Sequence, residues 1–291
     1  GTVEIHGSYA YISQNDVLYV VDVREPAQPQ VVGGIQLKDF RLPYITDIEV
    51  QPPLAYVSTV DRFTSCCFDV QLHLVDISQP ARPRLILSSS GIAGGDIEVV
   101  NQRVYATSLR WFVPLPALEI IDVVNASSFQ PRGSNGTNGS SSVAVDGSIV
   151  YVADYENGIR VIDAGDPDNL ELLATVSTPD VAYDVEVDGS YLYVAIANGL
   201  AVFDLSTPQA PALRSTREML GYPTDLEVTN GRAYVTFDSV GLAILDVRNP
   251  DDPELLTTYP VAESVRALEV DGSLIYLATS SGLQIVQATA P

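Results

Sequence analysis

Short runs in which apolar and polar residues alternate occur along the whole chain. In the segment DVEVDGSYLYVAIANGLAVFDLSTPQAPAL, which begins at Asp184, Val185 and Val187 alternate with Asp184 and Glu186. Alternation with a period of two residues predicts a β-strand with one face buried. Glycine and proline steps divide the segment into four such runs, so it predicts four short strands.

The same pattern recurs in seven units along the chain. The units begin at Thr2, Asp47, Asp96, Ser142, Asp184, Asp225 and Ala267. One tyrosine marks each unit: Tyr11, Tyr56, Tyr105, Tyr151, Tyr193, Tyr234 and Tyr276. The chain of 291 residues is thus divided into repeats of about 42 residues, at 1–46, 47–95, 96–141, 142–183, 184–224, 225–266 and 267–291.

Turn signals separate the expected strands within a unit. Asp188-Gly189 suits a two-residue hairpin turn with positive φ, and Asp146-Gly147, Asn230-Gly231 and Asp271-Gly272 repeat it. The third strand ends in an aspartate such as Asp204, which we expect to accept hydrogen bonds from the following turn. A Pro-x-x-Pro turn, such as Pro208 to Pro211, then leads to the fourth strand, because proline cannot donate into a sheet.

Seven four-stranded units predict an all-β protein, a seven-bladed β-propeller forming a single domain over residues 1–291. Blades packed around a channel bury both faces of each sheet, which explains the abundance of Val, Ile and Leu. An open solenoid is the alternative, but solenoid repeats are usually shorter or helical.

The third strands read LHLVD, LEIID, IRVID, LAVFD and LAILD, and the strands before two of them read YVAD and YVAI. These units resemble the LVIVD-repeat proteins, a bacterial group of β-propellers usually found in exported or surface-anchored chains. The resemblance covers nearly the whole chain and implies the fold and an exported or surface location. It implies no reaction, and the repeat motif contains no catalytic residue. Repeats one to three depart from the motif through long insertions.

The last repeat contains only three expected strands, because Pro291 aligns with Pro26 at the start of the proline turn. Two interpretations are open. The last blade is three-stranded with an exposed outer strand around Leu283 to Val286, or a flanking segment or partner strand pairs with that edge.

Composition narrows the classes of partner. The chain has 37 acidic and 15 basic residues, for a net charge of −22, which disfavours binding to nucleic acid or to an anionic membrane surface. No apolar run is long enough to span a bilayer. The only two cysteines are adjacent and there are only two histidines, so a disulfide framework and a zinc site are excluded by count.

A repeated glutamate is the first candidate for chemistry. It occupies one equivalent position of the first strand in six units, as Glu4, Glu49, Glu98, Glu186, Glu227 and Glu269. First strands line the channel of a propeller, so the last five residues of this set are a candidate Ca²⁺ or Mg²⁺ site; no other cofactor is expected. The alternative is structural: the glutamates face channel water, and the aspartates two residues earlier bind the backbone of a neighbouring blade.

The insertions of repeats one to three are the second candidate. They belong to two loop types that share one rim of a propeller, and they collect residue types that are rare elsewhere in the chain. The predicted binding patch consists of Phe40, Arg41, Arg62, Phe63, Cys66, Cys67, Phe68, Arg110, Trp111 and Phe112. Arginine and aromatic residues are enriched in binding hot spots, although long loops also need aromatic residues for a core of their own.

Adjacent Cys66 and Cys67 lie inside this patch. In an oxidising compartment they can close a vicinal disulfide, which would stiffen the loop; two free thiols or a bond to another chain are the alternatives.

Three functions are compatible with these observations. The first is a non-enzymatic recognition scaffold, secreted or on the cell surface, that binds a protein, glycan or small ligand at the insertion-bearing rim of blades one to three. The second is a purely architectural module of a larger surface protein. The third is a hydrolase that uses two channel carboxylates. Repetition of the acids with the blades argues against the third, because catalysis needs an asymmetric arrangement.

Overall fold

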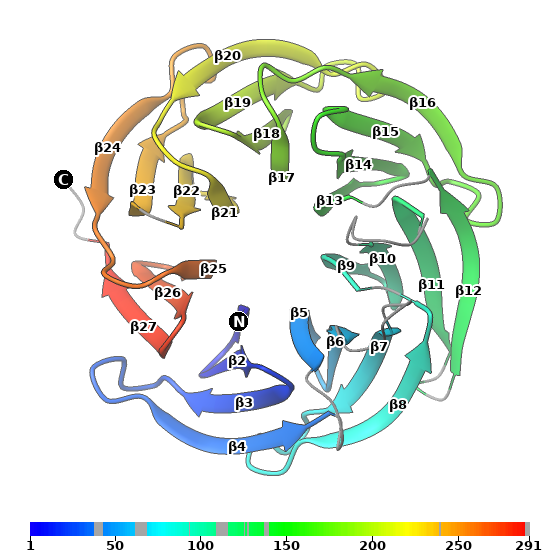
Figure 1. The fold of residues 1–291 in the computed structure, drawn as a ribbon, viewed down its shortest axis with the longest axis vertical. Helices are drawn as coiled ribbons and strands as arrows, with labels where there is room; N and C mark the ends of the chain where they lie inside the picture. The colour runs from blue at the N-terminus through cyan, green and yellow to red at the C-terminus, as the bar shows by residue number, and fades with distance from the viewer. Residues whose placement is uncertain are drawn as a thin grey trace.

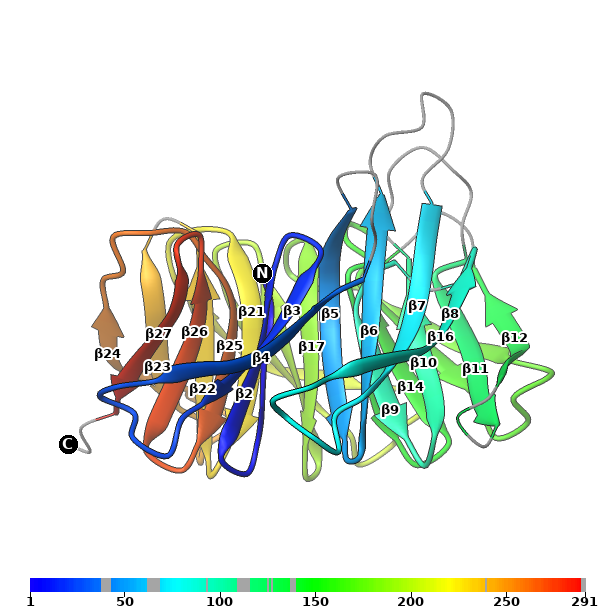
Figure 2. The ribbon, with the colours of Figure 1, turned by 90° about the horizontal axis from the view of Figure 1, so that it is seen from below.

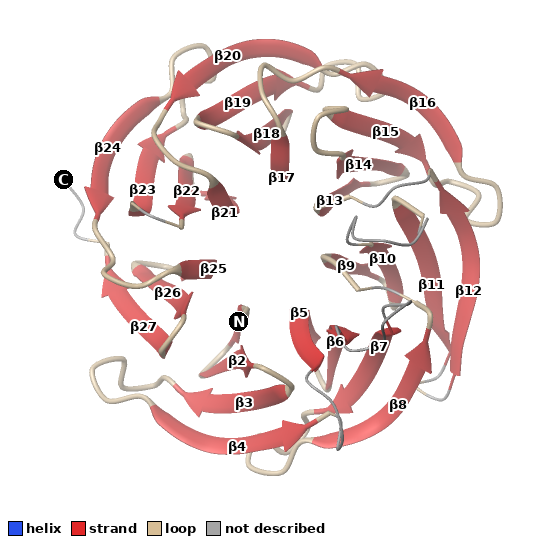
Figure 3. Cartoon of the chain, in the orientation of Figure 1, coloured by secondary structure: helices blue, strands red, loops and turns tan. Residues whose placement is uncertain are grey.

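The computed structural model describes residues 1–37, 43–61, 69–92, 94–108, 116–124, 126, 128–136, 140–238 and 240–288. Seven antiparallel sheets stand around a central channel (Figure 1), and strands and loops make up the described chain (Figure 3). The all-β seven-bladed propeller predicted from the repeats is therefore confirmed, including its three-stranded last blade.

Each blade follows the chain outward from the channel. Blade 1 contains β1 (Val3–His6), β2 (Tyr9–Gln14), β3 (Val17–Asp22) and β4 (Gln30–Gln36). Blade 2 contains β5 (Pro43–Gln51), β6 (Leu54–Asp61), β7 (Asp69–Asp76) and β8 (Arg84–Ser90). Blade 3 contains β9 (Ile97–Val100), β10 (Arg103–Thr107), β11 (Leu118–Val124) and β12 (Ser128–Asn135). Blade 4 contains β13 (Ser142–Asp146), β14 (Ile149–Ala153), β15 (Ile159–Asp163) and β16 (Glu171–Val176).

The remaining blades repeat this order. Blade 5 contains β17 (Ala182–Asp188), β18 (Tyr191–Ile196), β19 (Gly199–Asp204) and β20 (Ala212–Glu218). Blade 6 contains β21 (Pro223–Thr229), β22 (Arg232–Phe237), β23 (Gly241–Asp246) and β24 (Glu254–Tyr259). Blade 7 contains β25 (Val265–Asp271), β26 (Leu274–Thr279) and β27 (Gly282–Gln287).

The molecule has two rims with different connections. One rim, which we call the loop rim, carries the loops between the second and third strands, such as residues 154–158. It also carries the connections to the next blade, such as residues 219–222. The turn rim carries the first-to-second hairpins, such as residues 189–190, and the proline turns, such as residues 206–211. In Figure 2 the loop rim is at the top.

Side chains at the blade junctions form the core. The marker tyrosines are buried in all seven blades, each with at most 5% of its surface exposed. Hydrophobic clusters bridge each pair of neighbouring blades; that of blades 4 and 5, for example, joins Tyr151 and Val161 to Val194 and Phe203. Burying a large apolar side chain contributes about 1.5–3 kcal/mol, so each of these clusters stabilises the contact between its two blades.

The ring closes through side chains rather than through a shared sheet. Sheet β1–β4 and sheet β25–β27 contain no strand from the opposite end of the described chain. Instead Val3 and Ala10 of blade 1 pack with Ala267, Tyr276 and Ala278 of blade 7. Hydrophobic burial therefore joins the first and last blades here. Propellers that mix both chain ends in one blade join them through shared strands.

The hairpin turns required one correction. Asp188 pairs with Tyr191, so the central turn residues are Gly189 and Ser190, and not Asp188 and Gly189 as predicted. The hairpins at Asp146-Gly147 and Asp271-Gly272 are displaced by one residue in the same way. Gly189 has a φ of 60°, and glycine with positive φ at the first central position is typical of a type II′ turn. The prediction holds for Asn230-Gly231, where both φ values are positive.

The aspartates that end the third strands act as predicted. Asp22, Asp76, Asp163, Asp204 and Asp246 each accept a hydrogen bond from the backbone N–H two residues later, at 2.6–3.1 Å. Asp122 instead binds Arg103, whose Nε lies 2.6 Å from Oδ1. These acids therefore organise the turns that lead to the outer strands.

Candidate functional site

The predicted binding patch lies outside the described residues. This applies to all ten of its members: Phe40, Arg41, Arg62, Phe63, Cys66, Cys67, Phe68, Arg110, Trp111 and Phe112. The patch and the disulfide between Cys66 and Cys67 stay predictions. The strands that flank the insertions are described, however, and their ends define where the insertions attach.

Blade 2 is taller than the other blades on the loop rim. β5 has nine residues and β6 and β7 have eight each, whereas the corresponding strands of blades 4 to 7 have five to seven. Their extra length extends β5, β6 and β7 beyond the loop rim in Figure 2. The strands of blade 2 are therefore longer on the same rim at which the insertions interrupt the sequence repeat of about 42 residues.

The repeated glutamates line the central channel. All six lie in a cavity of about 750 Å³, together with Asp47, Asp96, Asp184 and Asp225. Burial raises their pKa values, to about 7 for Glu98 and Glu269, about 8 for Glu186 and about 9 for Glu227, and repulsion from neighbouring acids adds to the rise for the last three. Burial and repulsion also raise the pKa of Glu4 and Glu49 well above the usual range. The ring therefore holds protons at neutral pH.

A metal ion in this ring stays a prediction. In the described part of the chain, no three His, Cys, Asp or Glu side chains are grouped so that they could hold a metal ion. The glutamates Glu49, Glu98, Glu186, Glu227 and Glu269 share the channel without such a grouping. Glu227 has a buried Oε2 for which the described residues provide no hydrogen-bond partner, which is consistent with the raised pKa of its carboxyl group.

The channel aspartates tie neighbouring blades together, as the structural alternative predicted. Oδ2 of Asp47 accepts a hydrogen bond from the N–H of Ile97 at 2.9 Å, and Oδ2 of Asp96 accepts one from Val143 at 2.8 Å. Asp184 and Asp225 repeat the contact with Leu226 and Leu268. These four carboxylates are therefore structural groups.

The Asp154 to Gly158 segment, which weakly resembles a calcium loop, is a hairpin. Its N–H at Asp154 donates to the carbonyl of Gly158 at 2.8 Å. The buried carboxylate of Asp154 binds Nε of Arg160 at 2.6 Å. The carboxylate of Asp154 is thus engaged in an internal ion pair.

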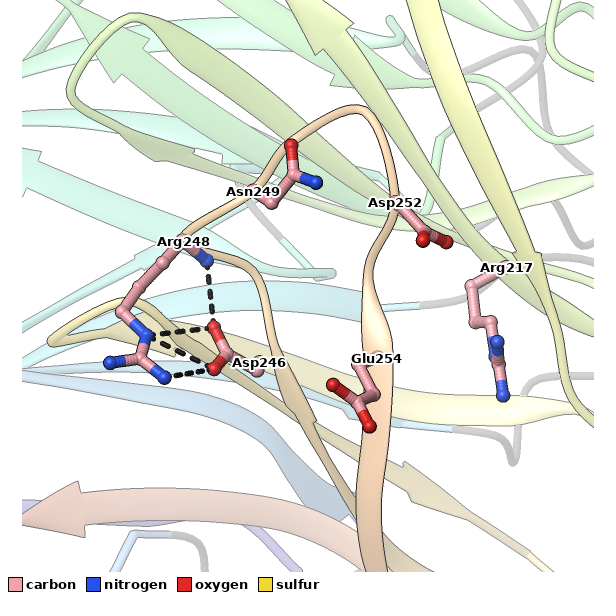
Figure 4. Close-up of a pocket in the computed structure, with 6 residues that line it drawn as sticks. All are labelled: Arg217, Asp246, Arg248, Asn249, Asp252 and Glu254. Carbon is pink, nitrogen blue, oxygen red and sulfur yellow. Dashed lines mark hydrogen bonds and ion pairs between the residues drawn. The ribbon is translucent and has the colours of Figure 1, made fainter.

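A groove of about 760 Å³ lies at the outer wall on the turn rim (Figure 4). It is lined by Arg217, Asp246, Arg248, Asn249, Asp252 and Glu254. Nε of Arg248 donates to both carboxylate oxygens of Asp246, at 2.9 and 3.0 Å. The same pairing of Asp22 with Arg24 lines a groove at the equivalent place in blade 1. The groove recurs with the repeat and therefore belongs to the turn architecture.

An apolar surface on the loop rim of blades 4 to 6 was not predicted from the sequence. Leu220 and Tyr222 are 83% and 67% exposed, more than any other large apolar residue described. The ring of Tyr222 meets Tyr183 edge to face at 6.2 Å, and Tyr183 meets Tyr155 in the same manner at 6.1 Å. The signal was present in the sequence, because the connection at Leu220-Gly221-Tyr222 carries two large apolar side chains while its counterpart at residues 178–180 reads Thr-Pro-Asp.

Comparison with known families agrees with this architecture. The LVIVD repeat matches residues 1–36, 67–90, 139–178, 181–216 and 220–261, which together cover more than half of the chain. The chain belongs to the LVIVD-repeat family. The resemblance inferred from the third strands is thereby confirmed.

Solved structures share the fold of this LVIVD-repeat propeller. A functionally unknown protein from Desulfotomaculum acetoxidans aligns with a TM-score of 0.73 and 12% identity, over 97% of this chain and 92% of that chain. The Cps50 (Swd1) β-propeller domain from Myceliophteria thermophila aligns with a TM-score of 0.74 and 10% identity, over 99% and 96%. The computationally designed protein Ika8 aligns with a TM-score of 0.67 and 8% identity, over 98% and 95%.

Identities this low establish similarity of fold alone. No curated protein matches the sequence. Among the described residues there is no helix of the length and apolarity needed to cross a membrane.

Proposed function

We propose that this LVIVD-repeat propeller is a non-enzymatic recognition scaffold, secreted or displayed on the cell surface, and that the loop rim is its binding face. The partner is a protein, glycan or small ligand, and the insertions of blades 1 to 3 contact it. The observation that carries the proposal is the asymmetry of the loop rim, where β5, β6 and β7 extend beyond the common strand length. A rigid scaffold that varies on one face is the usual arrangement of a binding protein.

Composition supports this assignment to the insertions. They contain Trp111, the only tryptophan, and Arg41, Arg62 and Arg110 in a chain with a net charge of −22. An acidic or aromatic-binding partner would find complementary groups there. The channel acids recur in the blades and four of them tie blades together, so they favour an architectural role over catalysis.

Two paired variants test the proposal. Trp111→Ala with Phe63→Ala alters the insertions, whereas Leu172→Ala with Leu213→Ala removes two half-exposed leucines from the outer strands near the turn rim. Both are screened as labelled proteins on peptide and glycan arrays, with wild type as reference. We expect the first pair to lose wild-type binding and to melt near the wild-type temperature, while the second pair keeps binding.

Two results would contradict the proposal. Unchanged binding by the first pair would place recognition elsewhere. A loss of several kcal/mol in the unfolding free energy of Trp111→Ala would show that Trp111 is the core of its loop. Absence of any ligand on the arrays would favour the purely architectural module.

A further inference from the structure

The connection from blade 5 to blade 6 holds an apolar side chain out in solvent. Its backbone is fixed by three hydrogen bonds: Met219 N–H to Asn198 O at 2.9 Å, Asn198 N–H to Gly221 O at 3.1 Å, and Asp238 N–H to Tyr222 O at 3.3 Å. Gly221 has a φ of 119°, which residues with a side chain rarely adopt. The exposure of Leu220 and Tyr222 is therefore built into the turn, and little ordering would be needed when a partner binds.

A groove of about 540 Å³ lies beside this connection. It is lined by Pro179, Asp180, Ile196, Ala197, Asn198, Thr216, Glu218, Met219 and Leu220. Ile196 and Ala197 are buried beneath the groove, and the half-buried Met219 presents an apolar side chain to it. The exposed Leu220 and Pro179 are its apolar walls. The groove is formed by blade 5 and by the connections that precede and follow it.

The charged residues that line this groove are all acidic. Asp180 and Glu218 lie exposed along it, and no basic residue of the described chain lines it. Arg217, next to Glu218 on β20, lines the separate groove shared with blade 6 (Figure 4). The carboxylate of Asp180 is held in place by the N–H of Val181 at 2.8 Å.

An apolar interior with an acidic edge is complementary to one kind of side chain. Lys and Arg have an apolar stem and a cationic head, so the stem can contact Met219 and Leu220 while the head faces Asp180 and Glu218. Tyr222 adds an exposed aromatic ring beside the groove, which attracts apolar groups and cations. A second copy of this chain is a poor occupant, because it carries the same net charge of −22.

We propose that this groove binds a Lys or Arg side chain of a partner polypeptide, with an adjacent apolar residue of the partner packing on Leu220 and Tyr222. This contact area is separate from the insertions of blades 1 to 3. The recognition scaffold proposed above does not depend on it, and each can fail without the other.

A random dodecapeptide library displayed on phage tests the proposal at 150 mM salt, with sequencing of the retained peptides. The library is selected in parallel on wild type, on Leu220→Ser, on Asp180→Asn with Glu218→Gln, and on Asp251→Asn with Glu254→Gln. The last variant makes the same change of charge on the turn rim and controls for general attraction of cations to an acidic protein. Leu220 and the four acids are exposed, so all variants should melt close to wild type.

We expect wild type and the turn-rim control to enrich peptides in which Lys or Arg adjoins an apolar residue. Both groove variants should bind those peptides at least about tenfold more weakly by fluorescence anisotropy. Equal binding to all variants, enrichment of peptides without a cation, or no enrichment would overturn the proposal. Dimer formation that depends on Leu220, measured by light scattering, would assign the surface to a second copy and would also overturn it.

The variant Trp111→Ala with Phe63→Ala distinguishes the groove proposal from the recognition scaffold proposed above. Peptides whose binding depends on Trp111 and Phe63 but not on Leu220 would leave the recognition scaffold intact and remove the groove. Peptides that depend on Leu220 alone would support the groove.

Discussion

Oδ2 of Asp184 accepts a hydrogen bond from the backbone N–H of Leu226 at 2.8 Å, which ties the first strand of blade 5 to that of blade 6. Three other blade junctions have the same contact, and between blades 4 and 5 the hydroxyl of Ser142 replaces the carboxylate as acceptor for Val185 N–H at 3.3 Å. In blade 7 the equivalent residue is Ala267, which packs on Val3 instead. This sequence position thus carries a polar residue at these five junctions and an apolar one where the ring closes.

The acceptor, rather than the charge, should account for the contribution of Asp184. Asp184→Ala leaves the N–H of Leu226 without its acceptor, so we expect a loss of about 1–3 kcal/mol in the unfolding free energy. Asp184→Asn keeps a carbonyl acceptor and removes a buried charge, so at pH 8 it should equal or exceed wild type. Urea denaturation gives the unfolding free energy of both variants. Equal losses of unfolding free energy in Asp184→Asn and Asp184→Ala would contradict the role of Asp184 as a hydrogen-bond acceptor.

The channel glutamates should make the protein less stable as the pH rises. Burial raises the pKa of Glu227 to about 9, so the folded protein keeps a proton that the unfolded chain releases near the ordinary glutamate pKa. That stabilisation is complete below about pH 4 and is lost as the pH rises through about 9, at up to about 1.4 kcal/mol per pH unit.

Glu227→Gln should therefore match wild type at pH 4.5 and exceed its melting temperature at pH 9. Glu171→Gln, on the exposed outer strand β16, makes the same charge change outside the channel. A Glu227→Gln advantage that did not grow with pH would show that the channel carboxyl is not responsible.

The predicted cation site in the ring has its own test. A divalent cation at Glu49, Glu98, Glu186, Glu227 and Glu269 must displace protons from groups whose pKa values are raised. If the prediction is right, millimolar Ca²⁺ or Mg²⁺ raises the melting temperature at pH 8.5 and has little effect at pH 5. The absence of a shift at both pH values would remove a stabilising site.

The contributions of Asp154 and Arg160 to stability should depend strongly on each other. The carboxylate is 2% exposed and its partner Nε lies 2.6 Å away, so Arg160→Ala leaves a buried charge without compensation. We expect a loss of about 3–5 kcal/mol. Asp154→Asn combined with Arg160→Met should recover much of that loss, and an additive double variant would show that the pair is not coupled.

The sequence predicted the features that packing repeats in every blade. Tyr151 and its six equivalents are buried because each blade needs the same large side chain at its junction, and Asp204 recurs because each third strand leads to the same turn. The hairpin register was wrong at Asp188, because a glycine with positive φ fits the first or the second turn position equally well in the sequence.

The candidate site was less accessible to sequence reasoning. Insertion length directed attention to blades 1 to 3, whereas the connection at Leu220 has ordinary length and differs only in polarity. Its groove combines Pro179, Ile196 and Met219 from three segments, and their proximity arises from the packing of the blade. Such a surface depends on tertiary structure. The alternation of apolar and polar residues along one strand does not predict it.

The central claim is that recognition takes place on the loop rim. Hydrogen–deuterium exchange, measured on the full chain with and without a saturating peptide selected on wild type without counter-selection, tests it directly. We expect protection on the loop rim in the insertions at residues 34–46, 60–71 and 108–117, and at 178–183 and 219–224 for a peptide that also occupies the groove, with unchanged exchange at the proline turns 206–211 and 248–253. Protection confined to the proline turns or the outer wall would contradict it.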